Sequence, residues 1–284
     1  MAPNGPSLND LRDEIDRLDD QILDALLRRA RIAADIAPLK AGAGAPLLRP
    51  GREAEVLRRL VAKAGDSFDA LTVVSIWREI MSAALRLQGP FSVAVAVPEV
   101  GPTCWALARS QYGVATSMMP AAGAAQAVAA VIEGRAQVAV VPFPQAEEAS
   151  PWWSRLLGDD APRVVARLPV AQGLAPPAGC TDGLVIAAMT PEASSEDRSL
   201  VAIETTEALS RASVARALEK AGLVLTFCAT GGAGSLVSLA EVEGFHANDA
   251  ALIEKLTEAF GDAARHIAVI GAYALPLSLK KPGA

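Results

Sequence analysis

Apolar side chains recur at helical spacing along the first part of the chain. They alternate spacings of three and four residues at Leu8, Leu11, Ile15, Leu18, Ile22 and Leu26. This pattern predicts one amphipathic helix over residues 8–40, roughly 50 Å long at about 1.5 Å per residue. Such a rod is longer than its own small domain can cover. Its apolar stripe therefore predicts a partner, most simply the same helix of a second chain.

Two shorter helices are predicted after the rod. The run AGAGAP at residues 41–46 is too rich in glycine to continue a helix. A helical pattern returns over residues 52–63, just after a proline that suits a helix start. Asp69 or Ser67 can cap a third helix that runs to Gln88.

The pattern changes after Gly89 and Pro90, which close the all-α three-helix domain predicted for residues 1–89. Short apolar runs then alternate with helical segments. Strands are predicted over residues 91–97, 138–143, 164–168 and 183–189, and helices over 103–112 and 122–133. This alternation predicts an α/β domain over residues 90–190 with a mostly parallel sheet.

The last third of the chain predicts a second, smaller sheet. The polar residues 190–198 suit a linker. Beyond it, strands are predicted over residues 200–204, 223–229, 236–242 and 266–273, and helices over 207–221 and 249–260. This βαββαβ order is that of a ferredoxin-like α+β unit, assigned to residues 198–276. The glycine-rich residues 230–235 precede no helix, which favours a hairpin turn over a dinucleotide-binding loop.

Composition narrows the classes of function. The chain is 51% hydrophobic and 20% charged, as expected of globular domains. Its net charge of −6 argues against a nucleic-acid partner, because phosphate binding relies on accumulated Lys and Arg. No secretory leader and no apolar run of membrane-spanning length is present, so we expect a cytoplasmic protein without a membrane partner.

Cysteine and histidine are too scarce for several kinds of chemistry. Cys104, Cys180 and Cys228 are far apart in sequence and show no zinc-ligand spacing, so we expect neither a disulfide nor a metal site. His246 and His266 both fall in the last third, and no nucleophile-elbow motif accompanies them. No cofactor is predicted.

Cationic side chains of the first domain carry the candidate chemistry. Arg29 and Lys40 are eleven residues apart on one side of the rod, roughly 16 Å at helical rise, so their side chains can hold a small dianion between them. Arg12 lies more than about 25 Å further along the same rod. A partner chain can bring it to the site if the long helices pack antiparallel. Taken singly, each arginine could instead be solvated or paired with neighbouring aspartates.

Residues 8–88 resemble the all-helical class of chorismate mutases. The resemblance runs through LNDLRDEIDRLDDQILDALLRRARIAADIAPLKA, RPGREAEVLRRL and IWREIMSAALRLQ. It implies an intertwined homodimer formed through the long helix, with chorismate as substrate. It also implies that Arg12 of the partner chain and Arg29 bind the carboxylates of the substrate. Lys40 and Gln88 contact its ether oxygen, and Glu53 contacts the ring hydroxyl.

By the same resemblance, Arg49 and Arg52 complete the pocket. The chain departs from the family at Ala84, where a serine often assists binding, and at Pro38, close to the ether-binding lysine. The reaction implied, a pericyclic rearrangement of chorismate to prephenate, needs no nucleophile, metal or acid–base pair. It is assisted by holding the reactive conformer and placing fixed cations beside the breaking C–O bond.

The remainder resembles the downstream part of bifunctional chorismate mutase/prephenate dehydratases. That resemblance implies a periplasmic-binding-like dehydratase domain and an ACT-type regulatory domain, which can bind a small-molecule effector. Several dehydratase motifs are missing. Thr181-Asp182-Gly183 replaces a Thr-Arg-Phe triplet, Pro144-Gln145 replaces Glu-Asn, and Ser210-Arg211-Ala212-Ser213 replaces an effector-binding turn.

An aspartate in place of an anion-binding arginine reverses the local charge. The sequence therefore predicts a chorismate mutase with an inactive dehydratase-like tail. Two alternatives stay open. One is a bifunctional mutase and dehydratase, favoured by the retained Thr181. The other is a non-catalytic regulator of another enzyme of the shikimate pathway, favoured by Ala84.

Overall fold

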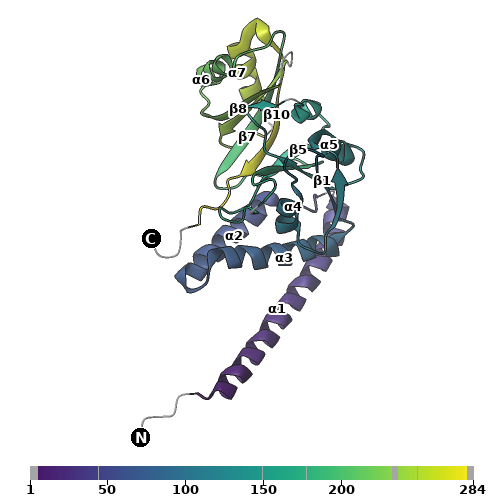
Figure 1. The fold of residues 1–284 in the computed structure, drawn as a ribbon, viewed down its shortest axis with the longest axis vertical. Coiled ribbons are helices and arrows are strands. Elements are labelled where there is room, and N and C mark those ends of the chain that lie inside the picture. The colour runs from purple at the N-terminus through teal and green to yellow at the C-terminus, as the bar shows by residue number, and fades with distance from the viewer. Residues whose placement is uncertain are drawn as a thin grey trace.

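A computed structural model describes residues 6–43, 45–148, 150–176, 178–231, 236–247 and 249–279. Three helices form a base, and the longest of them projects beyond it (Figure 1). A mixed sheet flanked by further helices stands on that base (Figure 1). Among the described residues, no helix combines the length and the apolar character needed to cross a bilayer.

The base consists of α1 (Leu8–Ala43), α2 (Pro50–Ala64) and α3 (Ala70–Gln88). The three predicted helices are confirmed. The carboxylate of Asp69 accepts a hydrogen bond of 2.7 Å from the backbone N–H of Thr72 and so caps α3. The first helix continues past its predicted end at residue 40. Pro38 lies inside it and removes one backbone hydrogen bond, but the helix does not end there.

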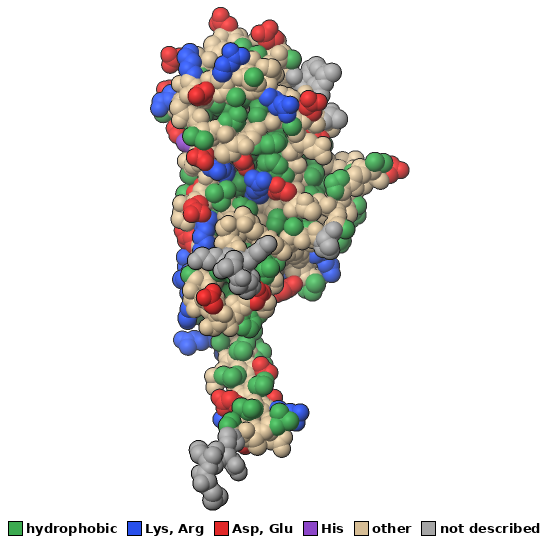
Figure 2. Space-filling model, turned by 60° about the vertical axis from the view of Figure 1, so that its left-hand side comes forward, with side chains coloured by type: hydrophobic (Ala, Val, Ile, Leu, Met, Phe, Trp, Pro, Cys, Tyr) green, Lys and Arg blue, Asp and Glu red, His purple; other side chains and the backbone are tan. Residues whose placement is uncertain are grey.

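The N-terminal half of α1 stands clear of the molecule (Figures 1 and 2). The apolar residues of its stripe are 46–64% exposed at Leu8, Leu11, Ile15, Leu18 and Ile22. The C-terminal half packs against α3, where Ala33 becomes buried. The protruding half of α1 therefore leaves its apolar stripe uncovered within this chain.

Ten strands form one sheet in the order β2-β1-β3-β6-β5-β10-β7-β9-β8-β4. The first six strands are β1 (Ser92–Ala96), β2 (Ser117–Ala121), β3 (Val138–Pro142), β4 (Glu147–Glu148), β5 (Arg163–Leu168) and β6 (Gly183–Ala187), with α4 (Trp105–Tyr112) and α5 (Ala124–Ile132) between them. Strand β1 pairs in parallel with β2 and β3, whereas β6 is antiparallel to both β3 and β5. Strands β2, β1, β3 and β5 therefore run in the same direction, so the mostly parallel sheet is as predicted in this half, with β6 as an antiparallel return between β3 and β5.

The remaining elements are β7 (Asp197–Thr205), α6 (Arg211–Lys220), β8 (Leu225–Gly231), β9 (Val237–Glu243), α7 (Ala250–Phe260) and β10 (Ala264–Ala274). They follow the predicted βαββαβ order and pair as β10-β7-β9-β8. Residues 232–235 of the predicted hairpin turn lie outside the described residues.

The two sheets predicted as separate domains are joined in the structure. Strand β10 pairs in parallel with β5 at Gly271 and Val164, and the short β4 pairs with β8 at the far edge. Gly271 allows the joint, because a Cβ at this position would collide with the backbone of Val164. The base is attached as well, since α2 packs against β5 and β10, and α3 packs against α4.

Candidate active site in the helical base

A cavity of about 410 Å³ lies among the three helices of the base. Its size is that of a small-molecule site. The polar side chains in its lining are Arg29, Lys40, Arg49, Arg52, Glu53 and Gln88. Apolar side chains complete the wall, among them Ile36, Val56, Met81 and Leu85.

The structure brings together seven of the eight residues predicted for the site, since Ala84 also lines the cavity. Arg12 is the exception. It lies exposed on the protruding half of α1, seventeen residues before Arg29 on the same continuous helix. Helical rise places it more than about 25 Å away, so this chain cannot bring Arg12 to its own cavity.

Arg29 and Lys40 reach the cavity from α1, and each is held by a backbone carbonyl. The Nη1 of Arg29 donates to Ile80 O of α3 at 3.4 Å. The Nζ of Lys40 donates to Leu47 O at 2.9 Å, which orients it across the loop that joins α1 to α2. Burial, and next the nearby charge of Arg49, lower the pKa of Lys40 below its ordinary value, while Glu192 and Glu53 oppose that change.

Gln88 closes the cavity from the last turn of α3. Its Nε2 donates to Ala84 O at 3.1 Å, and one of the two amide hydrogens satisfies that bond. The other hydrogen is left for a ligand. The Oε1 atom is buried without a hydrogen-bond partner among the described residues. Ala84 itself is buried and leaves room where a larger side chain would stand.

Glu53 is held by a buried arginine that sequence analysis did not single out. Arg78, on α3, is 2% exposed and donates through Nη1 to Oε2 of Glu53 at 2.6 Å. Its Nε donates to Gln111 O at the end of α4, at 3.0 Å. The sequence does carry a signal for Arg78, since it is a charged residue in the middle of an apolar helix face. Such a residue is seldom buried without a partner, so its position indicates a buried ion pair.

The cavity is strongly electropositive for a protein with a net charge of −6. Four cationic side chains face one carboxylate, that of Glu53, which is already paired with Arg78. In a partly enclosed site these charges act through a lower dielectric than that of water. The arrangement is suited to a small dianion.

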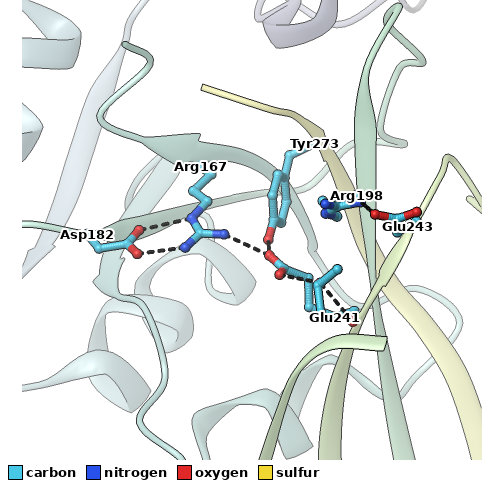
Figure 3. Close-up of polar contacts among 7 residues, drawn as sticks. Arg167, Asp182, Arg198, Glu241, Glu243 and Tyr273 are labelled. Atoms are coloured by element: carbon cyan, nitrogen blue, oxygen red, sulfur yellow. Dashed lines mark hydrogen bonds and ion pairs between the residues drawn. The ribbon is translucent and has the colours of Figure 1, made fainter. Parts of the chain in front are cut away.

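A second cavity, of about 500 Å³, lies beside the predicted dehydratase motif. Its lining includes Thr181, Asp182 and Arg167. Arg167 forms a bidentate ion pair with Asp182, at 3.1 and 2.7 Å, and contacts Glu241 at 2.8 Å (Figure 3). Its guanidinium also stacks on the ring of Phe143, 4.1 Å from the centroid.

Of the two carboxylate partners of Arg167, Glu241 is buried, whereas the side chain of Asp182 is 40% exposed. Glu241 accepts a hydrogen bond from Tyr273 (Figure 3). It also accepts one from Thr226 at 2.6 Å. Burial lowers the pKa of Arg167, but the hydrogen bond to Asp182 and the charges of Tyr273, Asp182 and Glu241 together outweigh that effect, so the net shift of the pKa is upward. The cation of this second cavity is therefore committed to protein carboxylates.

Two of the three cysteines are neighbours in space, although they are far apart in sequence. Cys104 and Cys180 belong to the same buried cluster. The neighbouring thiol of Cys180, and next burial, raise the pKa of Cys104. Both thiols are free, and Sγ of Cys180 donates to Asp182 O at 2.9 Å. They act as buried packing groups beside the second cavity.

Residues 11–89 match the family model of chorismate mutase type II. This segment coincides with the three helices and with the whole lining of the electropositive cavity. The helical base is thus the part of the chain that matches this family, and the chain continues beyond it into the mixed sheet.

Curated relatives match about half of the chain. The bifunctional chorismate mutase/prephenate dehydratase of Pseudomonas aeruginosa is 36% identical over 146 residues, which cover 50% of this chain and 40% of the relative. The protein of the same name from Aquifex aeolicus is 34% identical over 139 residues, covering 48% of this chain and 38% of the relative. The chain thus spans about two fifths of the length of these relatives.

Solved structures resemble about two thirds of the chain. Prephenate dehydratase from Streptococcus mutans covers 66% of this chain and 100% of its own, with a TM-score of 0.42 and 16% identity. GqqA, described as a novel type of quorum quenching acylase, covers 66% of this chain and 96% of its own, with a TM-score of 0.44 and 18% identity.

Proposed function

We propose that the protein is a chorismate mutase that rearranges chorismate to prephenate in aromatic amino acid biosynthesis. The observation that carries the proposal is the cavity of the helical base. It gathers Arg29, Lys40, Arg49, Arg52, Glu53 and Gln88 in a segment that matches the chorismate mutase type II family. A dianionic substrate fits the charge of this cavity, and no cofactor is needed.

The chemistry follows from the positions of the donors. Arg29 binds one carboxylate and holds the substrate in a compact conformer, which removes much of the entropic barrier. Negative charge grows on the ether oxygen as the C–O bond breaks. The ammonium of Lys40 and the free amide hydrogen of Gln88 stabilise that charge, because they are fixed before the reaction begins. Glu53, oriented by Arg78, accepts a hydrogen bond from the ring hydroxyl.

The proposed site is completed by a second copy of the chain. The exposed apolar stripe of α1 supports a homodimer formed through this helix, as antiparallel packing would cover the stripe. The same packing carries Arg12 to the cavity of the partner chain. Arg12 then binds the second carboxylate of the substrate.

The dehydratase-like part is proposed to be inactive. Thr181 remains at the second cavity, but the neighbouring Asp182 is acidic and neutralises Arg167. A dianion such as prephenate would meet two protein carboxylates and a cation already bound to both. Retention of Thr181 is the observation that favours the bifunctional alternative.

The βαββαβ unit is proposed to bind a small-molecule effector or to support oligomerisation. Its strands and helices are complete among the described residues, although its expected effector-binding turn is replaced by residues 210–213. Isothermal titration with each aromatic amino acid tests the effector. Absence of binding for all of them would leave oligomerisation as the role of this unit.

The activity is tested by incubating purified protein with chorismate and following the loss of its ultraviolet absorbance. One aliquot is then acidified to convert prephenate into phenylpyruvate, and a second is left untreated. We expect phenylpyruvate only after acid. Phenylpyruvate without acid would establish the bifunctional alternative, and no consumption of chorismate would support a non-catalytic regulator.

Replacing Lys40 by alanine is expected to abolish most of the turnover. Loss of one preorganised donor to a developing oxyanion costs about 3 to 4 kcal/mol in the barrier, or a factor of roughly 100 to 1,000 in kcat. Lys63→Ala, at the other end of the base, is the matched control. Turnover near that of the wild type in Lys40→Ala would refute the site assignment.

A further inference from the structure

The segment that follows β6 reaches back onto the helical base beside the mutase cavity. Oε1 of Glu192 accepts a hydrogen bond of 2.7 Å from Nε of Arg49, and the two side chains form an ion pair. Arg49 lines the cavity, whereas Glu192 is not among its lining residues. The contact joins residues 143 positions apart, one in the helical domain and the other in the stretch that sequence analysis treated as a linker.

This segment is fixed in place on both sides of Ala193. The backbone carbonyls of Glu192 and Ala193 lie 3.0 and 3.1 Å from the place of a Cβ on Gly51, so the segment packs directly on the first turn of α2. Further on, Arg58 donates to Ser194 and Ser195 at 3.3 and 3.0 Å. The position of Glu192 is thus set by α2 itself.

The end of the segment that joins β7 is held by further hydrogen bonds. The carboxylate of Asp197, at the start of β7, accepts from the backbone N–H and from the hydroxyl of Ser194, both at 2.7 Å. Arg58 also donates to Leu275 O, just after β10, at 3.2 Å. These bonds connect the segment to the central strands of the sheet.

The contact with Glu192 leaves the two terminal nitrogens of Arg49 available to bind a ligand. Glu192 uses only the Nε of the guanidinium, and among the described residues neither terminal nitrogen of Arg49 has a hydrogen bond or an ion pair. Oε2 of Glu192 is buried and accepts no hydrogen bond from the described residues, so the carboxylate is partly desolvated. A desolvated carboxylate holds a guanidinium more firmly than a fully hydrated one does.

We propose that Glu192 is a positioning residue of the mutase site, which fixes the guanidinium of Arg49 so that its terminal nitrogens bind the dianionic substrate. This inference rests on the proposed function. It means that the part of the chain beyond the mutase domain supplies a component of the mutase pocket. A change in the sheet can then reach the pocket through the segment of residues 192–197.

The test compares Glu192→Ala, Glu192→Gln and Arg49→Ala in the full chain, with KM and kcat for chorismate measured separately. Glu192→Ala is expected to raise KM about fivefold, which is the change in binding expected when a strong surface ion pair is lost. The kcat of this variant is expected to stay within about twofold of the wild-type value. Glu192→Gln is expected to restore KM, because its amide oxygen still accepts from Nε. In an Arg49→Ala background, Glu192→Ala is expected to change nothing further.

The matched control is Glu196→Ala, which removes a carboxylate from the same segment without touching Arg49. Thermal unfolding of every variant separates local effects from misfolding. The inference is overturned if Glu192→Ala leaves KM unchanged or lowers it, or if its effect persists without Arg49. If the wild type itself consumes no chorismate, the proposed function fails; if it is active and the cycle is additive, only the role of Glu192 fails.

Discussion

At the scale of single residues, the mutase pocket depends on how its charged groups are held. Arg29, Lys40 and Glu53 are each fixed by a partner outside the cavity, respectively a carbonyl of α3, a carbonyl of the connecting loop, and Arg78. Fixed charges stabilise a transition state without having to reorient during the reaction. The partners are therefore as testable as the groups that touch substrate.

Arg78→Met is expected to lower the free energy of unfolding by about 3 kcal/mol. The substitution keeps much of the buried volume but leaves Glu53 without its cation and removes one of the donors to Gln111 O. Urea denaturation measures the loss. Arg59→Met, on the exposed side of α2, is the control and is expected to change stability by less than about 0.5 kcal/mol. Equal stability of the two variants would contradict the role given to Arg78.

The pH dependence of turnover is expected to follow Lys40. Burial and the charge of Arg49 lower the pKa of Lys40, while Glu192 and Glu53 oppose them. In the proposed mechanism the protonated form of Lys40 is needed, so kcat/KM is expected to decline as the pH rises, and to do so at a pH below the ordinary pKa of lysine. The unfolded chain binds the proton of Lys40 more tightly than the folded chain does. The contribution of Lys40 to the free energy of unfolding therefore rises with pH between its lowered pKa in the folded chain and the ordinary pKa of lysine.

A pH–rate profile of the wild type and of Lys40→Arg checks this assignment. Arginine stays protonated across the accessible range, so any activity left in the variant should lose its alkaline decline. An identical decline in both proteins would assign the titration to another group.

At the scale of elements, sequence patterns located the helices well and the sheet less well. The stripe of α1 and the cap at Asp69 are local features, and both appear in the structure as predicted. Strand β2 was missed, because SMMPA contains a proline and no alternating pattern. The antiparallel return of β6 was also missed, since strand direction depends on contacts between distant segments rather than on local sequence.

The site shows the same division. The distance between Arg29 and Lys40, and the side of the helix that they share, could be predicted from the sequence, because helical geometry fixes both. The contacts of Arg78 and Glu192 could not, since each joins segments brought together only by folding. Local periodicity carries no information about such pairs.

Leu18→Lys is expected to dissociate the proposed dimer. Leu18 is 46% exposed within one chain and lies on the apolar stripe of α1. A dimer that buries this stripe would have to bury the lysine charge. Sedimentation velocity measures the mass, with Asp20→Lys on the opposite face of the helix as control. A wild-type monomer, or equal dissociation of both variants, would contradict the proposed dimer.

At the scale of the whole molecule, the chain is more integrated than its sequence suggests. The sheet continues from the α/β part into the βαββαβ unit through β5 and β10, and β4 returns to cover β8. Helix α2 lies against the same central strands. The Arg167, Glu241 and Tyr273 network crosses the joint as well (Figure 3). These contacts make the mutase domain and the sheet mechanically continuous.

The reach of α1 has a genetic consequence. Arg12 and Lys40 lie on the same helix but, in the proposed dimer, serve different cavities. An Arg12→Ala chain and a Lys40→Ala chain, each inactive alone, would form mixed dimers with one intact cavity. Random reassortment of equal amounts would restore about a quarter of wild-type activity, since half of the dimers are mixed and each has one working site of two. Two defective alleles of this protein would therefore complement each other in one cell.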